Sequence, residues 1–158
     1  MSKILQHRHT TYSESKKLFF YKIFQSITLN ARNKFFNLFI NNINYSNEKS
    51  IIDVGTTPSL DKEQNIFLEK IKDNQNVTCL SNQDCNILNK KYKNIKKVIV
   101  GNGLATKLKD NSFDIVHSNA TIEHVGSFEN QVLFVKEMIR ISKKNVFIQT
   151  PNRFYPIE

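Results

Sequence analysis

Residues 111–125 read NSFDIVHSNATIEHV, and this stretch decides how the rest of the chain is interpreted. The turn pair Asp110-Asn111 leads into an apolar run at 113–116, which ends in small and polar residues and then the acid–histidine pair Glu123-His124. In an open parallel sheet, ligands bind at the carboxyl ends of the strands. A strand that serves only packing would run directly into a turn. The stretch therefore predicts one wall of a binding site.

Strands and helices alternate on either side of this stretch. The pattern predicts helices at 59–72, with Asp61 and Gln64 at capping-box spacing, at 87–92, and at 128–141, capped by Ser127. It predicts apolar strands at 50–55, 76–80, 97–100, 113–117 and 145–149. Short apolar strands that alternate with helices are typical of a parallel sheet covered on both faces. We expect an α/β fold, a three-layer sandwich with a mainly parallel sheet of about five strands.

The N-terminal part has a different pattern, so we expect residues 1–47 to form a tail and helical cover and residues 48–158 to form the main domain. Apolar residues recur at steps of three or four, which predicts a helix over 16–43 that packs on the domain body. A membrane-surface helix is the alternative. His7 and His9 have a spacing that suits a metal ion, but we favour an exposed tail and expect no metal site.

The chain is basic, with a formal net charge of +9, and residues 85–109 contain seven Lys and no acid. An excess of basic over acidic residues favours binding to nucleic acid or to an anionic membrane surface. No stretch alternates basic and aromatic residues as a stacking groove does, so we favour a solvated basic face without a nucleic-acid partner. There is no secretory h-region and no run of about 18 apolar residues. Cys79 and Cys85 fit no metal or redox spacing, and we expect a cytoplasmic protein without a membrane span.

Three further strand ends carry residues suited to a ligand. The first ends in Asp53-Val54-Gly55, the second in Ser81, and the third in Gly101-Asn102-Gly103. Glycine allows the backbone to approach a ligand, and an acid can accept hydrogen bonds from a ligand amine. The dinucleotide fingerprint and the P-loop are both absent. The strand ends therefore suit a cationic nucleoside better than a dinucleotide.

Three stretches resemble class I S-adenosylmethionine-dependent methyltransferases, most closely the type 11, ubiquinone/menaquinone-methylase-like group. They are IIDVG at 51–55, GNGLATKLKDNSFDIVHSNATIEHV at 101–125 and NVFIQTPNRFYPIE at 145–158. The resemblance covers about residues 48–158 and implies a Rossmann-like fold, S-adenosylmethionine as cofactor, and methyl transfer to a small-molecule acceptor. Two other classes stay open. One is a degenerate or non-catalytic domain with a basic face for nucleic acid or a membrane surface, and the other is a nucleotide-binding domain of different chemistry.

The resemblance also implies roles for single residues. Ser81 and Asn102 stand where the family usually has acids that contact ribose and adenine, so weaker cofactor binding is expected, with Asp84 as a substitute acid. His124 is the candidate general base, and its alternative role is to cap the following turn. The positions that match the family's cofactor-binding residues are Asp53, Gly55, Ser81, Asn102, Gly103 and Asn119.

The resemblance implies a C-terminally incomplete domain, because the family's full fold has two more strands after the fifth. Only eight residues follow Thr150 here. In the family, the segment at this position forms part of the site for the methyl acceptor, so residues 151–158 are expected to begin the wall of that site. An unpaired fifth strand would offer a sheet edge for association into an oligomer.

Overall fold

The computed structural model describes residues 29–61 and 64–151. The chain divides into two units, residues 1–35 and 36–158. In the first unit, residues 29–35 are helical. The predicted polar tail and the first part of the predicted N-terminal helix, residues 1–28, lie outside the described residues.

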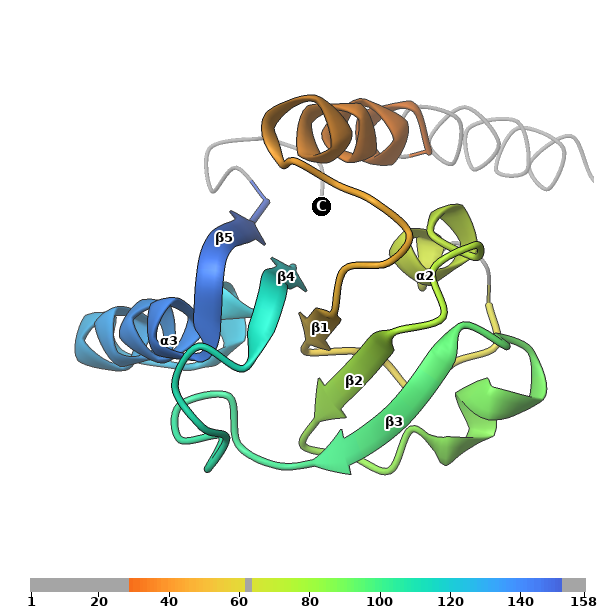
Figure 1. Ribbon diagram of the computed structural model, residues 1–158. Coiled ribbons are helices and arrows are strands. Elements are labelled where there is room, and N and C mark those ends of the chain that lie inside the picture. The colour runs from red at the N-terminus through yellow and green to blue at the C-terminus, as the bar shows by residue number, and fades with distance from the viewer. Residues whose placement is uncertain (1–28, 62–63, 152–158) are drawn as a thin grey trace, which may run out of the picture. The chain divides into compact units, whose positions relative to one another are not determined.

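The second unit contains a sheet of five parallel strands in the order β3-β2-β1-β4-β5 (Figure 1). The strands are β1 (Ile51–Val54), β2 (Val77–Ser81), β3 (Ile95–Val100), β4 (Phe113–Asn119) and β5 (Ser142–Gln149). All five lie at the predicted places, and the predicted parallel pairing is confirmed. The order places β1 at the centre, beside β4, although 64 residues separate their hydrogen-bonded partners Ser50 and Asp114.

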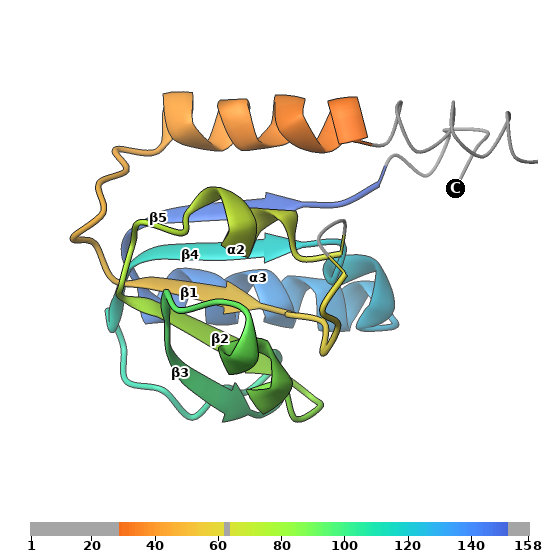
Figure 2. The ribbon, with the colours of Figure 1, turned by 90° about the vertical axis from the view of Figure 1, so that its right-hand side faces the viewer.

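Helices cover both faces of this sheet, as predicted for a three-layer, Rossmann-like sandwich (Figure 2). The helical elements are α2 (Ile66–Lys70), η1 (Asn86–Lys90), η2 (Ile122–His124) and α3 (Phe128–Ile141). One core cluster joins α2 and η1 to one face, which we call the α2 face, and the other cluster joins α3 to the opposite face. In the described ranges, no helix is both long and apolar enough to cross a membrane.

The strand residues alternate between the two faces. Ile51 and Ile115 belong to the cluster on the α2 face, whereas Ile52 belongs to the cluster on the α3 face. Side chains two positions apart in a strand point to the same face. This period places Asp53 and His117, each two residues further along its strand, on the α2 face.

Residues 36–43 pack on the α2 face, as predicted for the helical cover. Phe39 and Ile43 are buried in the cluster there, and Phe36 and Ile40 are partly buried against it. The ring of Phe39 meets that of Phe67 edge-on, with centroids 5.2 Å apart. Burial of one such side chain contributes about 1.5–3 kcal/mol.

Two helices differ from their predictions. Among the described residues of 59–72, the helical part is α2, which begins after Asn65. The predicted capping box is wrong, because the residue that precedes the helix is Asn65 and not Asp61. The predicted helix at 87–92 is the 3₁₀ turn η1. By contrast, α3 has the predicted bounds, and the Ser127 hydroxyl oxygen accepts from the Asn130 N–H at 3.3 Å.

Candidate functional site

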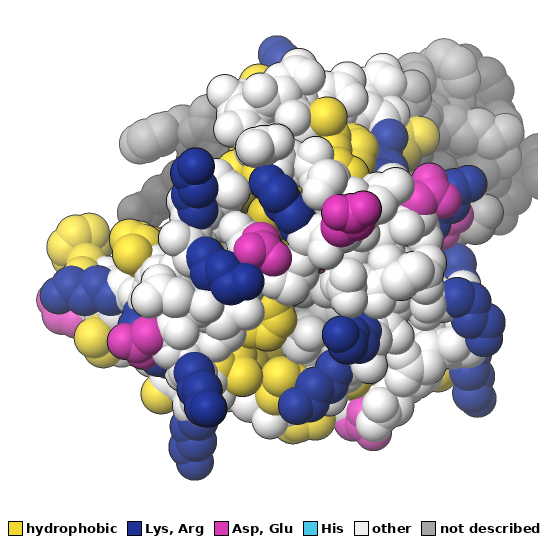
Figure 3. Space-filling view, in the orientation of Figure 1, with side chains coloured by type: hydrophobic (Ala, Val, Ile, Leu, Met, Phe, Trp, Pro, Cys, Tyr) yellow, Lys and Arg dark blue, Asp and Glu magenta, His cyan; other side chains and the backbone are white. Residues whose placement is uncertain are grey.

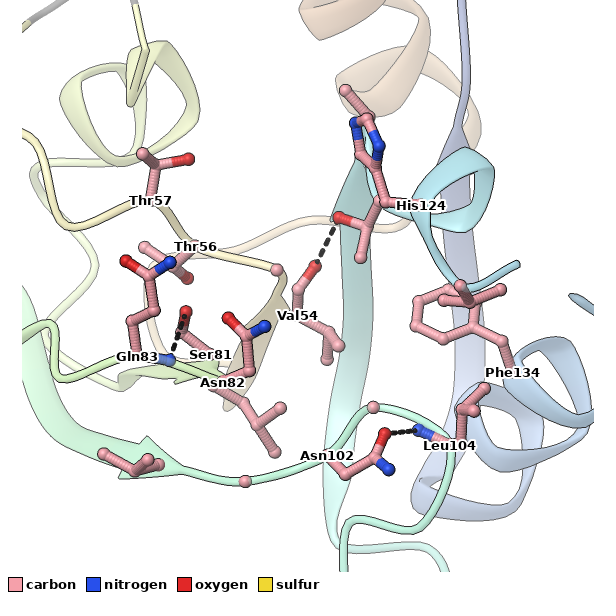
Figure 4. A pocket seen from close by; sticks show the side chains of 18 of the residues that line it. Val54, Thr56, Thr57, Ser81, Asn82, Gln83, Asn102, Leu104, His124 and Phe134 are labelled. Atoms are coloured by element: carbon pink, nitrogen blue, oxygen red, sulfur yellow. Dashed lines mark hydrogen bonds between the residues drawn. The ribbon is translucent and has the colours of Figure 1, made fainter. Parts of the chain in front are cut away.

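The carboxyl ends of β1 to β4 open onto a cavity of about 710 Å³ (Figure 4). Small-molecule sites have volumes of roughly 300–1,000 Å³, so this cavity has the size of a ligand site. Its described lining is Val54, Gly55, Thr56, Thr57, Pro58, Leu80, Ser81, Asn82, Gln83, Val100, Gly101, Asn102, Gly103, Leu104, Ala120, Thr121, His124, Val125 and Phe134.

The cavity is neutral over its described lining. No Asp, Glu, Lys or Arg belongs to this part of the wall, and the polar groups are hydroxyls, amides and one imidazole. Such groups both donate and accept hydrogen bonds. The described wall can therefore bind a polar ligand through hydrogen bonds but offers no carboxylate to a cation.

The loop after β1, residues 55–59, is called the first loop here. Gly55 lets it lie close to the residues that follow β4. Its φ is +93°, and a Cβ atom there would lie only 2.0 Å from Thr121 Oγ1. The Thr121 hydroxyl in turn lies 3.3 Å from the main-chain oxygen of Val54. Only glycine fits this close approach, because both the conformation and the space exclude a side chain.

The first loop is held from its outer side by buried groups. The Asn65 amide donates to the main-chain oxygens of Thr57 at 3.1 Å and Ser59 at 2.7 Å. The Cys85 thiol donates to the main-chain oxygen of Thr56 at 3.4 Å. Burial raises the pKa of the Cys85 thiol, so it stays protonated and can donate. These contacts fix the shape of the cavity wall after β1.

The second wall is a run of three polar residues at the end of β2. Ser81, Asn82 and Gln83 all line the cavity, and Figure 4 shows them on the side opposite His124. The Ser81 hydroxyl oxygen accepts from the Gln83 N–H at 3.3 Å. Asp84, the proposed substitute acid, is not in the described lining. Its carboxylate accepts from the Asn86 N–H at 2.8 Å, a local bond across the turn before η1.

The third wall contains Asn102 and Gly103. The Asn102 side-chain oxygen accepts from the Leu104 N–H at 2.9 Å, which closes a tight turn. A Cβ atom on Gly103 would lie 2.9 Å from the ring of Phe134 in α3. Gly103 thus allows the loop after β3 to pack directly on α3.

A charged network ties the same loop to α3. Glu137 accepts from both the N–H and the hydroxyl of Thr106, at 2.7 and 2.6 Å, and Arg140 donates to both Glu137 oxygens, at 2.8 and 2.7 Å. Arg140 also donates to Leu108 O at 2.8 Å and pairs with Asp110. The Arg140 guanidinium, with help from Thr106, lowers the pKa of Glu137 to about 2. Glu137 therefore stays ionised at neutral pH.

The fourth wall follows β4. Ala120 has a φ of +50°, a conformation that non-glycine residues rarely adopt. Its N–H donates to the main-chain oxygen of Gln149 in β5 at 2.9 Å, which keeps the turn in place. His124, in η2, is exposed and stands at the edge of the cavity (Figure 4).

Five predicted site residues thus line one cavity: Gly55, Ser81, Asn102, Gly103 and His124. Asp53 and Asn119 are not in its described lining. The Asp53 carboxylate points to the α2 face and bonds His117, while the main-chain oxygen of Asn119 accepts from the Thr121 hydroxyl at 3.1 Å. Direct contact of Asp53 or Asn119 with a ligand stays a prediction.

Some residues of this wall were not predicted from the sequence, among them Gln83 and Phe134. Gln83 lies two residues past β2, where a position count from the strand end would find it. Phe134 shows no signal of its own, because it reaches the cavity only through the packing of α3 against Gly103.

A known protein family matches this chain. The family model described as Methyltransferase domain matches residues 66–148, which is more than half of the sequence. The chain therefore belongs to the family of S-adenosylmethionine-dependent methyltransferase domains. No curated protein matches the chain.

Solved structures, two of them described as S-adenosylmethionine-dependent methyltransferases, share the fold. A S-adenosylmethionine-dependent methyltransferase from Archaeoglobus fulgidus aligns with a TM-score of 0.56 and 15% identity, over 82% of this chain and 54% of its own. A S-adenosylmethionine-dependent methyltransferase from Methanosarcina mazei aligns with a TM-score of 0.51 and 18% identity, over 63% and 50%. The YcgJ protein from Bacillus subtilis aligns with a TM-score of 0.53 and 16% identity, over 71% and 47%. The chain spans about half the length of these proteins.

Proposed function

We propose that this chain binds S-adenosylmethionine in the cavity at the strand ends and transfers its methyl group to a small-molecule acceptor. The single observation that carries the proposal is the convergence of four strand ends on one 710 Å³ cavity in a chain of this family. We also propose that it belongs to the ubiquinone/menaquinone-methylase-like group, on the resemblance of residues 101–125.

The residues present fit such a cofactor. Gly55 brings the backbone of the first loop close to Thr121 and so forms part of the cavity wall. The side-chain amides of Asn82, Gln83 and Asn102 can form hydrogen bonds with a nucleoside. The missing carboxylates remove charge-assisted bonds, which are roughly twice as strong as neutral ones. We therefore expect weaker binding than in a site with acids at these positions.

When bound, the cofactor would supply an electrophilic methyl group. The chain contributes position and exclusion of water, which are the main sources of rate in a displacement of this kind. His124 lies at the rim, where an acceptor would arrive, and its imidazole can take a proton from an oxygen or nitrogen nucleophile. Its exposure leaves it accessible to an acceptor in solution.

The partners follow from the same arrangement. We propose a small-molecule acceptor that enters beside His124. The expected acceptor-side wall at 151–158 falls almost wholly outside the described residues. In the described sheet, β5 pairs on one side only, with β4, and we propose its other edge as the surface for any self-association.

Calorimetric titration with S-adenosylmethionine and S-adenosylhomocysteine tests the proposal. We expect saturable heat with both, and loss of most of it in Asp53→Ala. Absence of heat with the wild-type chain would contradict cofactor binding. An Asp53→Ala variant that binds as tightly as wild type would remove Asp53 from the site.

The neutral lining favours a second candidate, a domain that binds the cofactor without transferring its methyl group. Full binding without turnover of any acceptor would support it. A role in nucleic-acid binding has less support. Figure 3 shows Lys and Arg scattered among acidic and neutral side chains on the visible face. If the chain bound nucleic acid through these charges, its affinity for nucleic acid would fall steeply as salt is added.

A further inference from the structure

A buried, hydrogen-bonded pair of an aspartate and a histidine lies next to the first loop of the cavity. His117 Nδ1 in β4 is 2.6 Å from Asp53 Oδ1 in β1, and the two residues are paired in the parallel register of these strands. Both are more than nine-tenths buried, at 4% and 7% exposure. Neither lines the cavity in the described part of the chain, and the function proposed above gives His117 no role.

The imidazole is fixed by aromatic rings on the α2 face. The His117 ring stacks on Phe67 with centroids 3.5 Å apart and 3° between the planes, and it meets Phe39 edge-on at 5.8 Å. Phe147 in β5 lies parallel to it at 6.1 Å. Because an ionised carboxylate can only accept, the hydrogen on Nδ1 points to Asp53. The rings and the hydrogen bond together leave the imidazole one orientation.

A hydrogen bond between Thr56 and Asp53 connects the pair to the cavity wall. The Thr56 hydroxyl lies 3.0 Å from Asp53 Oδ2 and also 3.0 Å from the Asp53 main-chain oxygen. Thr56 lines the cavity, and the N–H groups of Gly55 and Thr56 both donate to the main-chain oxygen of Leu80, at 2.8 and 3.3 Å. A chain of contacts thus runs from the aromatic cluster through His117 and Asp53 to the first loop.

We propose that His117 is a positioning residue for the cofactor site. It holds the Asp53 carboxylate on the α2 face, and Asp53 in turn fixes Thr56 and the glycine turn before it. This inference rests on the proposed function for its ligand, but the effect on the loop is a property of the unliganded chain.

The inference makes a prediction opposite to that of direct contact. If Asp53 served by bonding the cofactor amine, removal of His117 would free the carboxylate for that task and affinity would persist or rise. If Asp53 serves by fixing the loop, removal of His117 leaves the Oδ1 atom of a buried carboxylate without its partner. The carboxylate must then turn toward water, and the loop loses its support.

The test compares four variants by two readouts. They are His117→Leu, which removes the donor; His117→Asn, whose amide nitrogen replaces Nδ1; Asp53→Asn, which keeps the acceptor without the charge; and Phe147→Leu, which removes ring packing alone. The first readout is hydrogen exchange of the Gly55 and Thr56 amides in the unliganded chain. The second is the Kd for S-adenosylmethionine by calorimetry.

We expect His117→Leu to speed exchange of both amides about tenfold and to weaken the Kd about tenfold, the size of one hydrogen bond to a charged group. His117→Asn, Asp53→Asn and Phe147→Leu should each stay within about threefold of wild type in both readouts.

Three results would overturn the inference: unchanged exchange and affinity in His117→Leu, an equal loss in Phe147→Leu, or an Asp53→Asn variant with normal exchange but a tenfold weaker Kd. If His117→Leu does not fold, the Asp53→Asn result still decides, because direct contact predicts a weaker Kd for that variant and loop fixing predicts a normal one. If the wild type binds no S-adenosylmethionine, the proposed function fails, whereas the exchange rates still test the role of His117.

Discussion

Gly55 and Thr121 approach so closely that a Cβ atom on Gly55 would lie 2.0 Å from Thr121 Oγ1. We expect Gly55→Ala to lose stability, because the φ of +93° alone costs an L-residue about 1–2 kcal/mol and the clash adds to this. Cofactor binding should be lost with it. Urea unfolding and calorimetry measure the two effects.

Gly101→Ala is the matched control, since the nearest atoms to a Cβ there are 3.9 Å away and its φ is not in the left-handed region. Its stability should stay within about 0.5 kcal/mol of wild type. Equal behaviour of the two variants would show that the Gly55 approach has no special importance.

The neutral wall predicts a gain from added charge. Asn102→Asp keeps the oxygen that accepts from the Leu104 N–H and adds a carboxylate at the cavity wall. We expect tighter binding of the cationic S-adenosylmethionine, by about threefold or more, and no gain for the neutral S-adenosylhomocysteine. Asn89→Asp, exposed in η1 and outside the cavity lining, should change neither. Equal gains for both ligands would contradict an electrostatic origin.

Glu137 should contribute to stability in a pH-dependent way. Its pKa is lowered to about 2 from an ordinary 4.5, mainly by Arg140, so the native state favours the ionised form. The stabilisation is complete above about pH 4.5 and is lost as the pH falls through 2. Glu137→Gln should cost about 1.5–3 kcal/mol at pH 7 and flatten the fall in stability between these values.

Glu69→Gln is the control for this prediction. Glu69 pairs with Lys91 at 3.7 Å and has a side chain that is 41% exposed, so its loss should cost less than about 1 kcal/mol. Denaturant unfolding from pH 2 to 7 measures both variants. An unchanged pH slope in Glu137→Gln would contradict the role of the Arg140 contact.

Ala120 is expected to carry backbone strain at φ +50°. Ala120→Gly should therefore raise the free energy of unfolding by about 1 kcal/mol, because glycine adopts this conformation without cost. Ala105→Gly, at a residue without positive φ, should instead lower it by about 0.4–1 kcal/mol through unfolded-state entropy. Thermal unfolding compares them, and a loss in both would show that Ala120 is not strained.

The sheet could be predicted from the sequence because its strands are short apolar runs that end in glycine or polar residues. The same signal located Gly55, Ser81, Asn102, Gly103 and His124 at the cavity. The start of α2 could not be predicted, since Asp61 and Gln64 have capping-box spacing but Asn65 is the residue that precedes the helix.

The face of the sheet to which the Asp53 side chain points could have been predicted from the sequence. The period of two along β1 gives Asp53 the face of Ile51, and the same period gives His117 the face of Ile115. Their contact depends on β1 and β4 being neighbours, which requires the strand order. By contrast, the network of Thr106, Glu137 and Arg140 depends on how the loop after β3 lies on α3, and no local pattern encodes that.

The strand order has a consequence for how the chain folds. The central strand β1 pairs with β4 across contacts that are 64 residues apart in sequence, and parallel pairs of this kind form late because loop closure must come first. Two walls of the cavity come from β1 and β2 and a third from β3, but the fourth exists only once β4 has docked. A ligand can therefore stabilise only those folding species in which the two halves of the sheet have already met, and it cannot guide the earlier steps.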